Sequence, residues 1–220
     1  MWVGIAVGGG IVSASLWVLG LRLAPHEHGR ALNTLPSWLR WLLFITVVVT
    51  SSGGAILAVS VVGNRPAVIA FGLFAAASPA VAVIDATAHR IPYLLTGALV
   101  ITGAVCFMWD AEVTGDVAAL KRAAWAALVV GAFGFVLWLP RSGIGPGDVA
   151  LFAVLGGYAG WVSWPLVEWG IGLGCLVAAV GVSVALLWRR WGEIVVPYGA
   201  FLLAGWWTAF MFADRIHHLY

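Results

Sequence analysis

Two aspartates stand at the ends of long apolar stretches, where a carboxylate is unusual. Asp85 ends the stretch "AVAVID", and Asp148 follows "GIGPG" and opens a stretch that carries no charge until Glu168. Two carboxylates held close together share one proton, because both cannot ionise at low cost. The ionised member can take a proton from water while the protonated member donates to a carbonyl. If the fold brings Asp85 and Asp148 together, their chemistry is that of an aspartic protease.

The composition indicates what kind of fold must position them. Of the 220 residues, 63% are hydrophobic and 9% are charged, and the mean hydropathy is +1.03. A soluble domain carries about 25% charged residues, and a membrane-spanning helix needs roughly 20 apolar ones. We therefore expect one all-α polytopic membrane domain over residues 1–220. The net charge of +2 is too small to indicate a nucleic-acid partner.

Polar residues divide the chain into eight apolar segments. The weakest division lies at 163–168, where a tight hairpin is expected. We predict about eight transmembrane helices, at residues 2–21, 41–62, 67–84, 92–109, 123–139, 149–164, 167–188 and 195–213.

The basic residues predict the orientation. With both termini on the extracytoplasmic side, the cytoplasmic loops carry Arg22, Arg30, Arg40, Arg90, Arg141, Arg189 and Arg190. The opposite side then carries Arg65, Lys121, Arg122 and Arg215. This excess agrees with the positive-inside rule. The prediction is a multi-pass protein of the inner (cytoplasmic) membrane.

The alternation of spans places the two aspartates at one depth. Asp85 lies where the third span reaches a membrane face, and Asp148 lies where the sixth span leaves a face. Counting the intervening spans puts both on the same side, whichever way the protein is inserted. Each also has a simpler interpretation: Asp148 as a first-turn acid favoured by a helix dipole, and Asp85 as an interfacial acid beside Arg90.

Small residues and cysteines suggest packing rather than chemistry. Gly156 and Gly160, and likewise Gly170 and Gly174, are four residues apart, the spacing at which helix backbones approach closely in lipid. Cys106 and Cys175 lie inside apolar segments without metal-ligand spacing, so we expect two buried small hydrophobes.

Three short motifs in register resemble those of the type IV prepilin peptidases, which are membrane aspartyl proteases of the GxGD type. In this family an aspartate ends a span and is followed by Arg-Ile-Pro-Asn, and here Asp85 precedes "RIPY" at 90–93. Gly-x-Gly-Asp opens a later span, and here it is "GPGD" at 145–148. Pro-Phe-Gly-Pro-Phe-Leu opens the last span, and here it is "PYGAFL" at 197–202. The likeness covers about residues 67–210.

The resemblance implies a function and a set of site residues. Asp85 and Asp148 would be the catalytic pair, and the substrate would be the short basic leader of a prepilin or pseudopilin, cut at the cytoplasmic face ahead of its hydrophobic helix. Residues expected to bind substrate or shape the loops are Arg90, Pro92, Gly145, Gly147, Pro197 and Gly199. We expect "SGIGPGD" to be an unwound loop whose glycines adopt conformations closed to other residues and let an extended peptide approach.

The chain also departs from the family pattern. Tyr93 replaces Asn, Ala150 replaces the usual Lys, and Ala200 replaces the second Pro of the third motif, which puts substrate preference and turnover in doubt. The first cytoplasmic loop is short and has no cysteine, unlike the cysteine-bearing domain that the bifunctional members use for N-methylation. We therefore expect a peptidase without methyltransferase activity.

No metal or other cofactor is expected. His26, Glu27 and His28 alternate in the first loop without a further ligand nearby, so a solvated loop is the simpler interpretation. Two functions compete with the peptidase: a proton-coupled transporter or export component with the two aspartates as relay sites, and an inactive scaffold of a pilus-assembly system. The sequence does not determine the oligomeric state.

Overall fold

The computed structural model describes residues 36–88, 91, 93–139, 144–188 and 197–217. Throughout these residues the regular structure is helical. The helices are α3 (Ser37–Val62), α4 (Ala67–Ala88), α5 (Tyr93–Thr114), α6 (Val117–Trp138), α7 (Pro146–Val162), α8 (Trp164–Trp188), α9 (Tyr198–Met211) and α10 (Ala213–His217). The all-α prediction is therefore confirmed for the described part of the chain.

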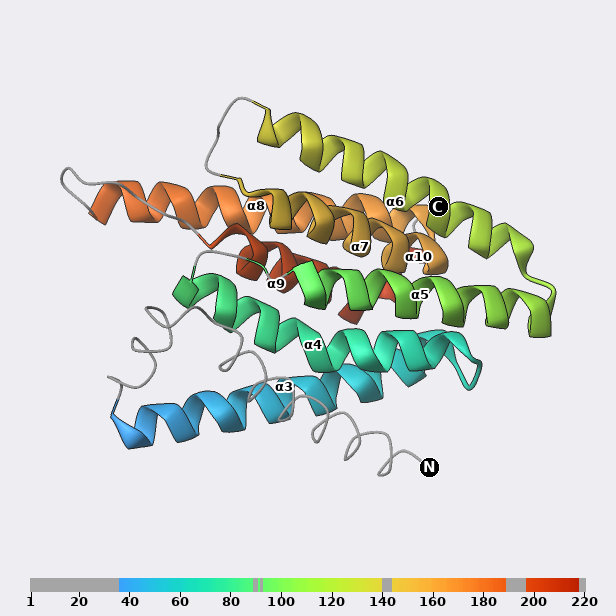
Figure 1. Ribbon diagram of the computed structural model, residues 1–220, viewed down its shortest axis with the longest axis horizontal. Helices are drawn as coiled ribbons and strands as arrows, with labels where there is room; N and C mark the ends of the chain where they lie inside the picture. Colours follow the sequence, from blue (N-terminus) through green and yellow to red (C-terminus); the bar gives the residue numbers. More distant parts are fainter. Residues whose placement is uncertain (1–35, 89–90, 92, 140–143, 189–196, 218–220) are drawn as a thin grey trace.

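The helices lie roughly parallel or antiparallel in one bundle (Figure 1). Helix α3 packs on α4, α6 packs on α7, and α8 packs on α9. Helices α4, α5 and α7 also contact one another or α9 through their inner faces. Because successive long helices reverse direction, the end of α4 and the beginnings of α5, α7 and α9 lie toward one end of the bundle (Figure 1).

Five of the described helices, α3, α4, α5, α6 and α8, are long and apolar enough to cross a membrane. The predicted spans at 149–164 and 195–213 correspond to α7 and α9, which have 17 and 14 residues and fall short of that length. The predicted span at 2–21 lies outside the described residues. Eight spans and the orientation of the termini therefore stay predictions.

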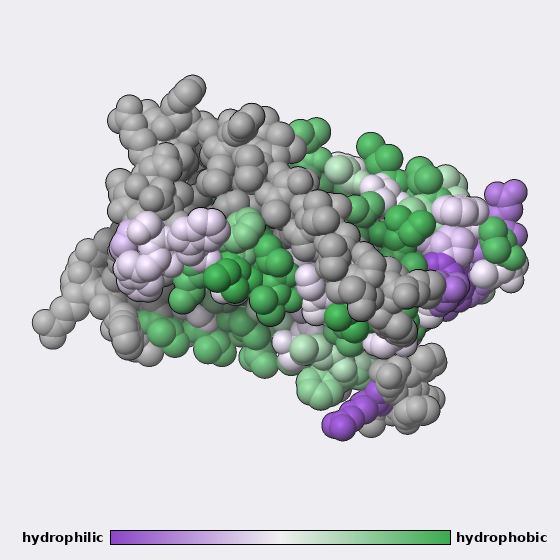
Figure 2. Space-filling model, turned by 90° about the horizontal axis from the view of Figure 1, so that it is seen from below, coloured by the Kyte–Doolittle hydropathy of each residue, from purple (hydrophilic) through white to green (hydrophobic). Residues whose placement is uncertain are grey.

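The surface agrees with a membrane environment. Among the residues coloured in Figure 2, apolar ones predominate between the two ends, and most of the strongly hydrophilic ones lie at the right-hand end. Large apolar side chains on the outer helices are exposed, among them Ile101 on α5 and Leu128 on α6. Outward-facing apolar side chains are what lipid requires of a spanning helix.

Aromatic side chains from four helices fill the centre of the bundle. Phe71 and Phe74 of α4 pack on Tyr158 of α7 with ring centroids 5.3 and 4.8 Å apart, and Phe74 packs on Trp206 of α9 at 4.9 Å. The polar atoms of these rings are satisfied: the Tyr158 hydroxyl donates to the Leu99 carbonyl at 3.0 Å. The core therefore fixes the positions of α4, α7 and α9 relative to one another.

Glycines bring the outer helices close to this core. A Cβ at Gly156 would lie 2.6 Å from the Ala126 carbonyl oxygen of α6, and one at Gly174 would lie 3.2 Å from Leu202 of α9. Gly160 and Gly170 likewise face α6 and α9. The packing role predicted for the four glycines is confirmed.

Most observed boundaries differ from the predicted ones by a few residues, and the two largest differences are explained by charges that have partners inside the protein. Helix α5 continues past Asp110, and α6 begins before Lys121 and Arg122, whereas the predicted spans stopped at these charges. Asp110 is fully buried because Arg65 pairs with it. The Arg122 guanidinium reaches back to the carbonyl oxygens that end α7. The tight hairpin expected at 163–168 is present, since Ser163 alone separates α7 from α8.

Candidate active site

Asp85 lies near the end of α4 and faces the beginning of α9. Its side chain is buried, with 4% of its surface exposed. The backbone N–H of Ala200, in the first turn of α9, donates to Asp85 Oδ2 at 3.2 Å. A helix amino terminus presents free N–H groups and a positive dipole end, so it holds a carboxylate without a cationic side chain.

Asp148 is the third residue of α7 and is also buried, with 8% exposed. The Gly145 N–H donates to Asp148 Oδ2 at 2.8 Å, and the Asp148 N–H donates to the Gly145 carbonyl at 3.0 Å. This reciprocal pair of hydrogen bonds caps the helix. Asp148 is therefore a first-turn acid, as one of the two interpretations from the sequence predicted. This role does not account for Oδ1, which is buried and has no hydrogen-bond partner among the described residues.

The two carboxyl groups lie close enough for the charge of Asp85 to act directly on Asp148. Ile91 lies next to Gly147, which precedes Asp148, and next to Gly199, which contacts Asp85. A Cβ at Gly147 would lie 2.9 Å from the Ile91 carbonyl oxygen, and one at Gly199 would lie 2.7 Å from Ile91 Cδ1 and 3.1 Å from Asp85 Oδ2. Ile91 is therefore held between the beginnings of α7 and α9, near the two carboxylates.

The glycines act through this close packing and not through special backbone angles. Gly145 has φ −90° and ψ 162°, which any residue adopts, and Gly147 lies within the first turn of α7. The expectation that these glycines need conformations closed to other residues is wrong for Gly145. The helix also begins at Pro146, so the unwound segment is shorter than expected. Gly147 and Gly199 are required because a side chain there would collide with Ile91 or Asp85.

The remaining predicted residues are placed as follows. Pro197 precedes the first residue of α9 and serves as its N-cap residue. Arg90 and Pro92 lie outside the described residues, as do His26, Glu27 and His28. Of the departures from the family motifs, Tyr93 begins α5 with an exposed side chain, whereas Ala150 is half-buried in α7. Neither contacts Asp85 or Asp148 through a hydrogen bond within the described residues.

Two residues of the site were not recognised as such from the sequence: Ile91 was not singled out, and Ala200 was noted only as a departure from the third motif. Ile91 separates Gly147 from Gly199, and Ala200 supplies the amide that holds Asp85. Both lie inside the quoted motifs "RIPY" and "PYGAFL". The available signal was the motif as a whole, since neither an isoleucine side chain nor a backbone amide indicates chemistry by its residue type.

The third buried aspartate, Asp110, has a different environment at the opposite end of the bundle. Arg65 Nε donates to its two oxygens at 3.2 and 2.9 Å, Arg65 Nη2 donates to Oδ2, and the Ala67 N–H donates to Oδ1 at 3.2 Å. The hydrogen bond that Arg65 donates to Asp110 raises the pKa of the Arg65 guanidinium. Asp110 is therefore paired with a cation, and both of its oxygens accept hydrogen bonds.

The described residues contain no cluster of three or more His, Cys, Asp or Glu that could hold a metal ion. The site offers two buried carboxyl groups, a backbone amide on one oxygen of each, and a second oxygen of Asp148 that has no partner among the residues described. Such a pair can exchange protons with a water molecule and a carbonyl group.

Residues 72–213, which include both aspartates and all three motifs, match the type IV leader peptidase family. The chain belongs to this family. The recognition made from Asp85, Asp148 and the motifs around them is confirmed.

Curated relatives of the family carry the name prepilin leader peptidase/N-methyltransferase. The protein of Burkholderia pseudomallei is 35% identical over 148 residues, 63% of this chain and 44% of its own length. The protein of Pseudomonas aeruginosa is 31% identical over 152 residues, which are 64% of this chain and 48% of the relative. That of Aeromonas salmonicida is 33% identical over 87 residues, 39% and 29%. The chain thus aligns with less than half the length of these relatives. No solved structure matches the chain.

Proposed function

We propose that the protein is a membrane aspartyl endopeptidase that removes the short leader of type IV prepilins or pseudopilins at the cytoplasmic membrane face. The observation that carries the proposal is the burial of Asp85 and Asp148 within range of each other's charge, with Asp148 Oδ1 unpartnered among the described residues. Membership of the leader peptidase family and the names of the relatives support the substrate class.

The proposed reaction needs only these two groups and water. The ionised carboxylate takes a proton from water as the water oxygen bonds to the scissile carbonyl carbon, and the protonated carboxyl donates its proton to the carbonyl oxygen. Collapse of this intermediate breaks the carbon–nitrogen bond, and the departing nitrogen receives a proton from the pair. The products are a leader with a new carboxyl end and a pilin with a free amino end. The two aspartates titrate as a pair.

The transporter alternative is less well supported by the position of the pair. Asp85 lies in the last turn of the span Ala67–Ala86, and Asp148 lies in the first turn of α7. Transporter sites lie near the membrane midplane, within broken helices. The inactive-scaffold alternative rests on Tyr93 and Ala150, and these residues leave the carboxylates and their amide donors intact.

We further propose that the protein does not methylate the new amino end. The two cysteines of the chain lie in α5 and α8, so neither belongs to a cysteine-bearing cytoplasmic domain. A methyl-transfer assay with S-adenosylmethionine and cleaved pilin tests this directly. Transfer above the level of a protein-free blank would contradict it.

The test of the main proposal is leader removal in vitro. The purified protein, in detergent, is mixed with a full-length prepilin that has a basic leader and a hydrophobic helix, and the products are identified by mass spectrometry. We expect one cut ahead of the helix, unchanged by EDTA because no metal takes part. The Asp148→Asn protein serves as the control for contaminating proteases. Absence of the cut with the parental protein, or an equal cut with the control, would contradict the proposal.

A further inference from the structure

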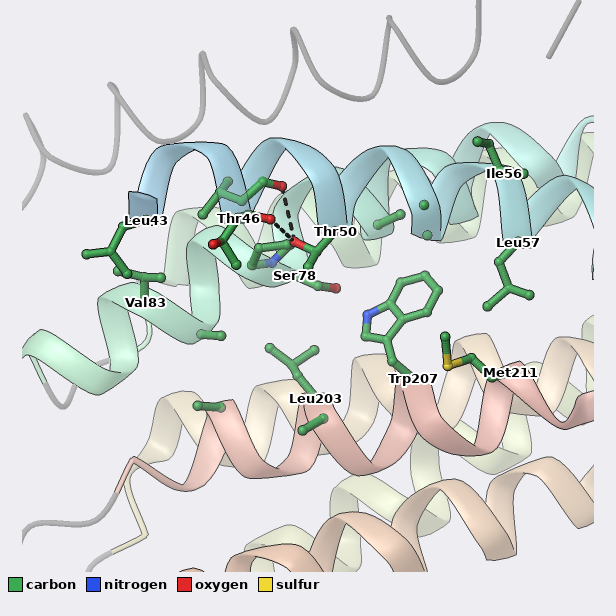
Figure 3. Close-up of a pocket in the computed structure, with 18 of the residues that line it drawn as sticks. Leu43, Thr46, Thr50, Ile56, Leu57, Ser78, Val83, Leu203, Trp207 and Met211 are labelled. Carbon is green, nitrogen blue, oxygen red and sulfur yellow. Dashed lines mark hydrogen bonds between the residues drawn. The ribbon is translucent and has the colours of Figure 1, made fainter. Parts of the chain in front are cut away.

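A large apolar cavity lies between α3, α4 and α9, beside the aspartate pair. It has a volume of about 720 Å³, and its lining includes Leu57, Pro79, Leu203 and Trp207 (Figure 3). The lining also includes Ala200, whose N–H donates to Asp85. One part of the cavity wall is thus the same residue that holds a carboxylate of the candidate site.

The hydroxyl groups of this wall all donate to backbone carbonyl oxygens of their own helices. Thr46 and Thr50 donate to the carbonyl oxygens of Leu42 and Thr46 at 2.8 and 2.7 Å. Ser60 and Ser78 donate to those of Leu57 and Phe74 at 2.8 and 2.7 Å. Because these hydroxyl protons point back to the backbone, the wall presents a mainly apolar surface. It fits a hydrocarbon surface and not a polar solute.

The dimensions match one face of a membrane helix. Residues of the α3 wall run from Leu43 to Ser60, about 26 Å at about 1.5 Å per residue, close to the roughly 30 Å hydrocarbon core of a bilayer. A helix of that length and about 10 Å across fills about 2000 Å³, well above the volume of the cavity. The groove therefore accommodates the side chains of one helix face, and the small residues Gly53, Ala75 and Ala204 in its wall permit a close approach.

We propose that this groove binds the hydrophobic helix of the substrate prepilin, with the amino end of that helix at Ala200. This inference rests on the proposed function, because a leader peptidase must hold the helix that follows the cut so that the scissile bond reaches Asp85 and Asp148. The wall formed by α3 precedes residues 72–213, the part that matches the family. Recognition of the helix would thus depend partly on a segment outside the catalytic motifs.

Gly53 provides a test with a matched control. A Cβ at Gly53 would meet no atom within 4 Å, and Gly53 lines the groove. Gly172 of α8 is also exposed and equally free of neighbours, but it does not line the groove. Gly53→Leu and Gly53→Trp therefore add bulk to the groove in two steps with no clash at Cβ, whereas Gly172→Leu and Gly172→Trp make the same changes elsewhere.

Two substrates are compared: a full-length prepilin and a short peptide that carries the leader and the cleavage site without the hydrophobic helix. We expect Gly53→Trp to raise the KM for the prepilin by about tenfold or more while leaving cleavage of the peptide within about twofold. Gly53→Leu should have a smaller effect of the same kind, and both Gly172 variants should behave as the parental protein. Equal loss on both substrates, or no loss on the prepilin, would overturn the groove assignment and leave a lipid chain or another segment of this protein as its occupant.

A binding measurement separates failure of this inference from failure of the proposed function. A photoreactive benzoylphenylalanine replaces Ala204 in the groove or Val129 on the exposed side of α6, in the Asp148→Asn background that keeps the prepilin uncut. Cross-linking of the prepilin helix from position 204 and not from 129 supports the groove even if the parental protein proves inactive. Cross-linking from both positions alike, or from neither, would overturn it.

Discussion

The two ends of the helix bundle bury aspartates in opposite ways. At one end Asp110 is matched by a guanidinium, a backbone amide and a bidentate hydrogen-bond pattern from Arg65. At the other end Asp85 and Asp148 each receive a backbone amide but no basic side chain among the described residues. The first arrangement satisfies every oxygen of its carboxylate, whereas the second gives Asp148 Oδ1 no hydrogen-bond partner within the described part of the chain.

We expect the Asp110 end of the bundle to serve stability and the Asp85 and Asp148 end to serve chemistry. A buried charge with a complete set of partners holds its surroundings together, and removal of one partner is costly. A buried carboxyl pair that is held by helix amino termini, with no cation beside it among the described residues, keeps its protons available because neither member is fixed in the charged form. The same residue type thus joins α5 to the loop before α4 at one end, and forms the candidate site at the other.

The largest effect should come from the pair itself. Asp85→Asn or Asp148→Asn preserves the shape of the side chain but removes the ability to exchange a proton, so we expect cleavage of the prepilin to fall by about a thousandfold or more. The measurement is the initial rate of leader loss in detergent. Each variant should elute as the parental protein does in size-exclusion chromatography. Activity within tenfold of the parental rate in either variant would exclude a catalytic pair.

At the opposite end the effect should appear in stability. Arg65→Leu leaves the fully buried Asp110 without its cation, which we expect to lower the free energy of unfolding by about 3 kcal/mol. Thermal unfolding in detergent measures the change, with Asp110→Asn as a milder comparison. Cleavage assayed well below the unfolding temperature should remain near the parental rate. A strong loss of cleavage at that temperature would contradict the division between the two ends.

Variants of the glycines near Ile91 test whether close packing positions the candidate site. Gly199→Val places a side chain against Ile91 and Asp85, and Gly147→Val places one against the Ile91 carbonyl. A displacement of about 1 Å in such a site costs about a hundredfold in rate, which we expect for both. Gly145→Ala is the matched control, because the nearest atom to its new Cβ would be 3.5 Å away and its backbone angles suit alanine. Equal losses in all three variants would favour the earlier explanation from glycine flexibility.

The smallest effect should come from Arg122, which caps the far end of the helix that begins near Asp148. Its guanidinium donates to the carbonyl oxygens of Gly160, Trp161 and Val162 at 2.6, 2.7 and 3.1 Å. Arg122→Gln removes most of these bonds, and we expect a loss of about 1–2 kcal/mol in stability. Lys121→Gln, an adjacent change of the same charge, should leave the unfolding temperature nearly unchanged. Equal shifts for both would show that net charge, and not the cap, is responsible.

The sequence was sufficient for several features of the fold and the site. Apolar segments of about 20 residues predict helices because a chain in lipid must satisfy its own backbone hydrogen bonds. The alternating direction of those helices predicted that Asp85 and Asp148 lie at one end of the bundle, and the motifs around them identified the family. Sequence alone failed at Asp110 and Arg122, where a charge was taken as the end of a span. Partners distant in the chain make these charges tolerable inside helices.

What only the tertiary structure decided are the contacts between elements remote in sequence. The amide that holds Asp85 belongs to Ala200, 115 residues away, and Gly147 and Gly199 meet through Ile91. The groove likewise needs faces of α3, α4 and α9 together. Such contacts depend on how helices rotate and cross when their side chains interdigitate. Local apolar patterning fixes that a helix forms and how long it is, but leaves its rotation about its own axis to the neighbours against which it packs.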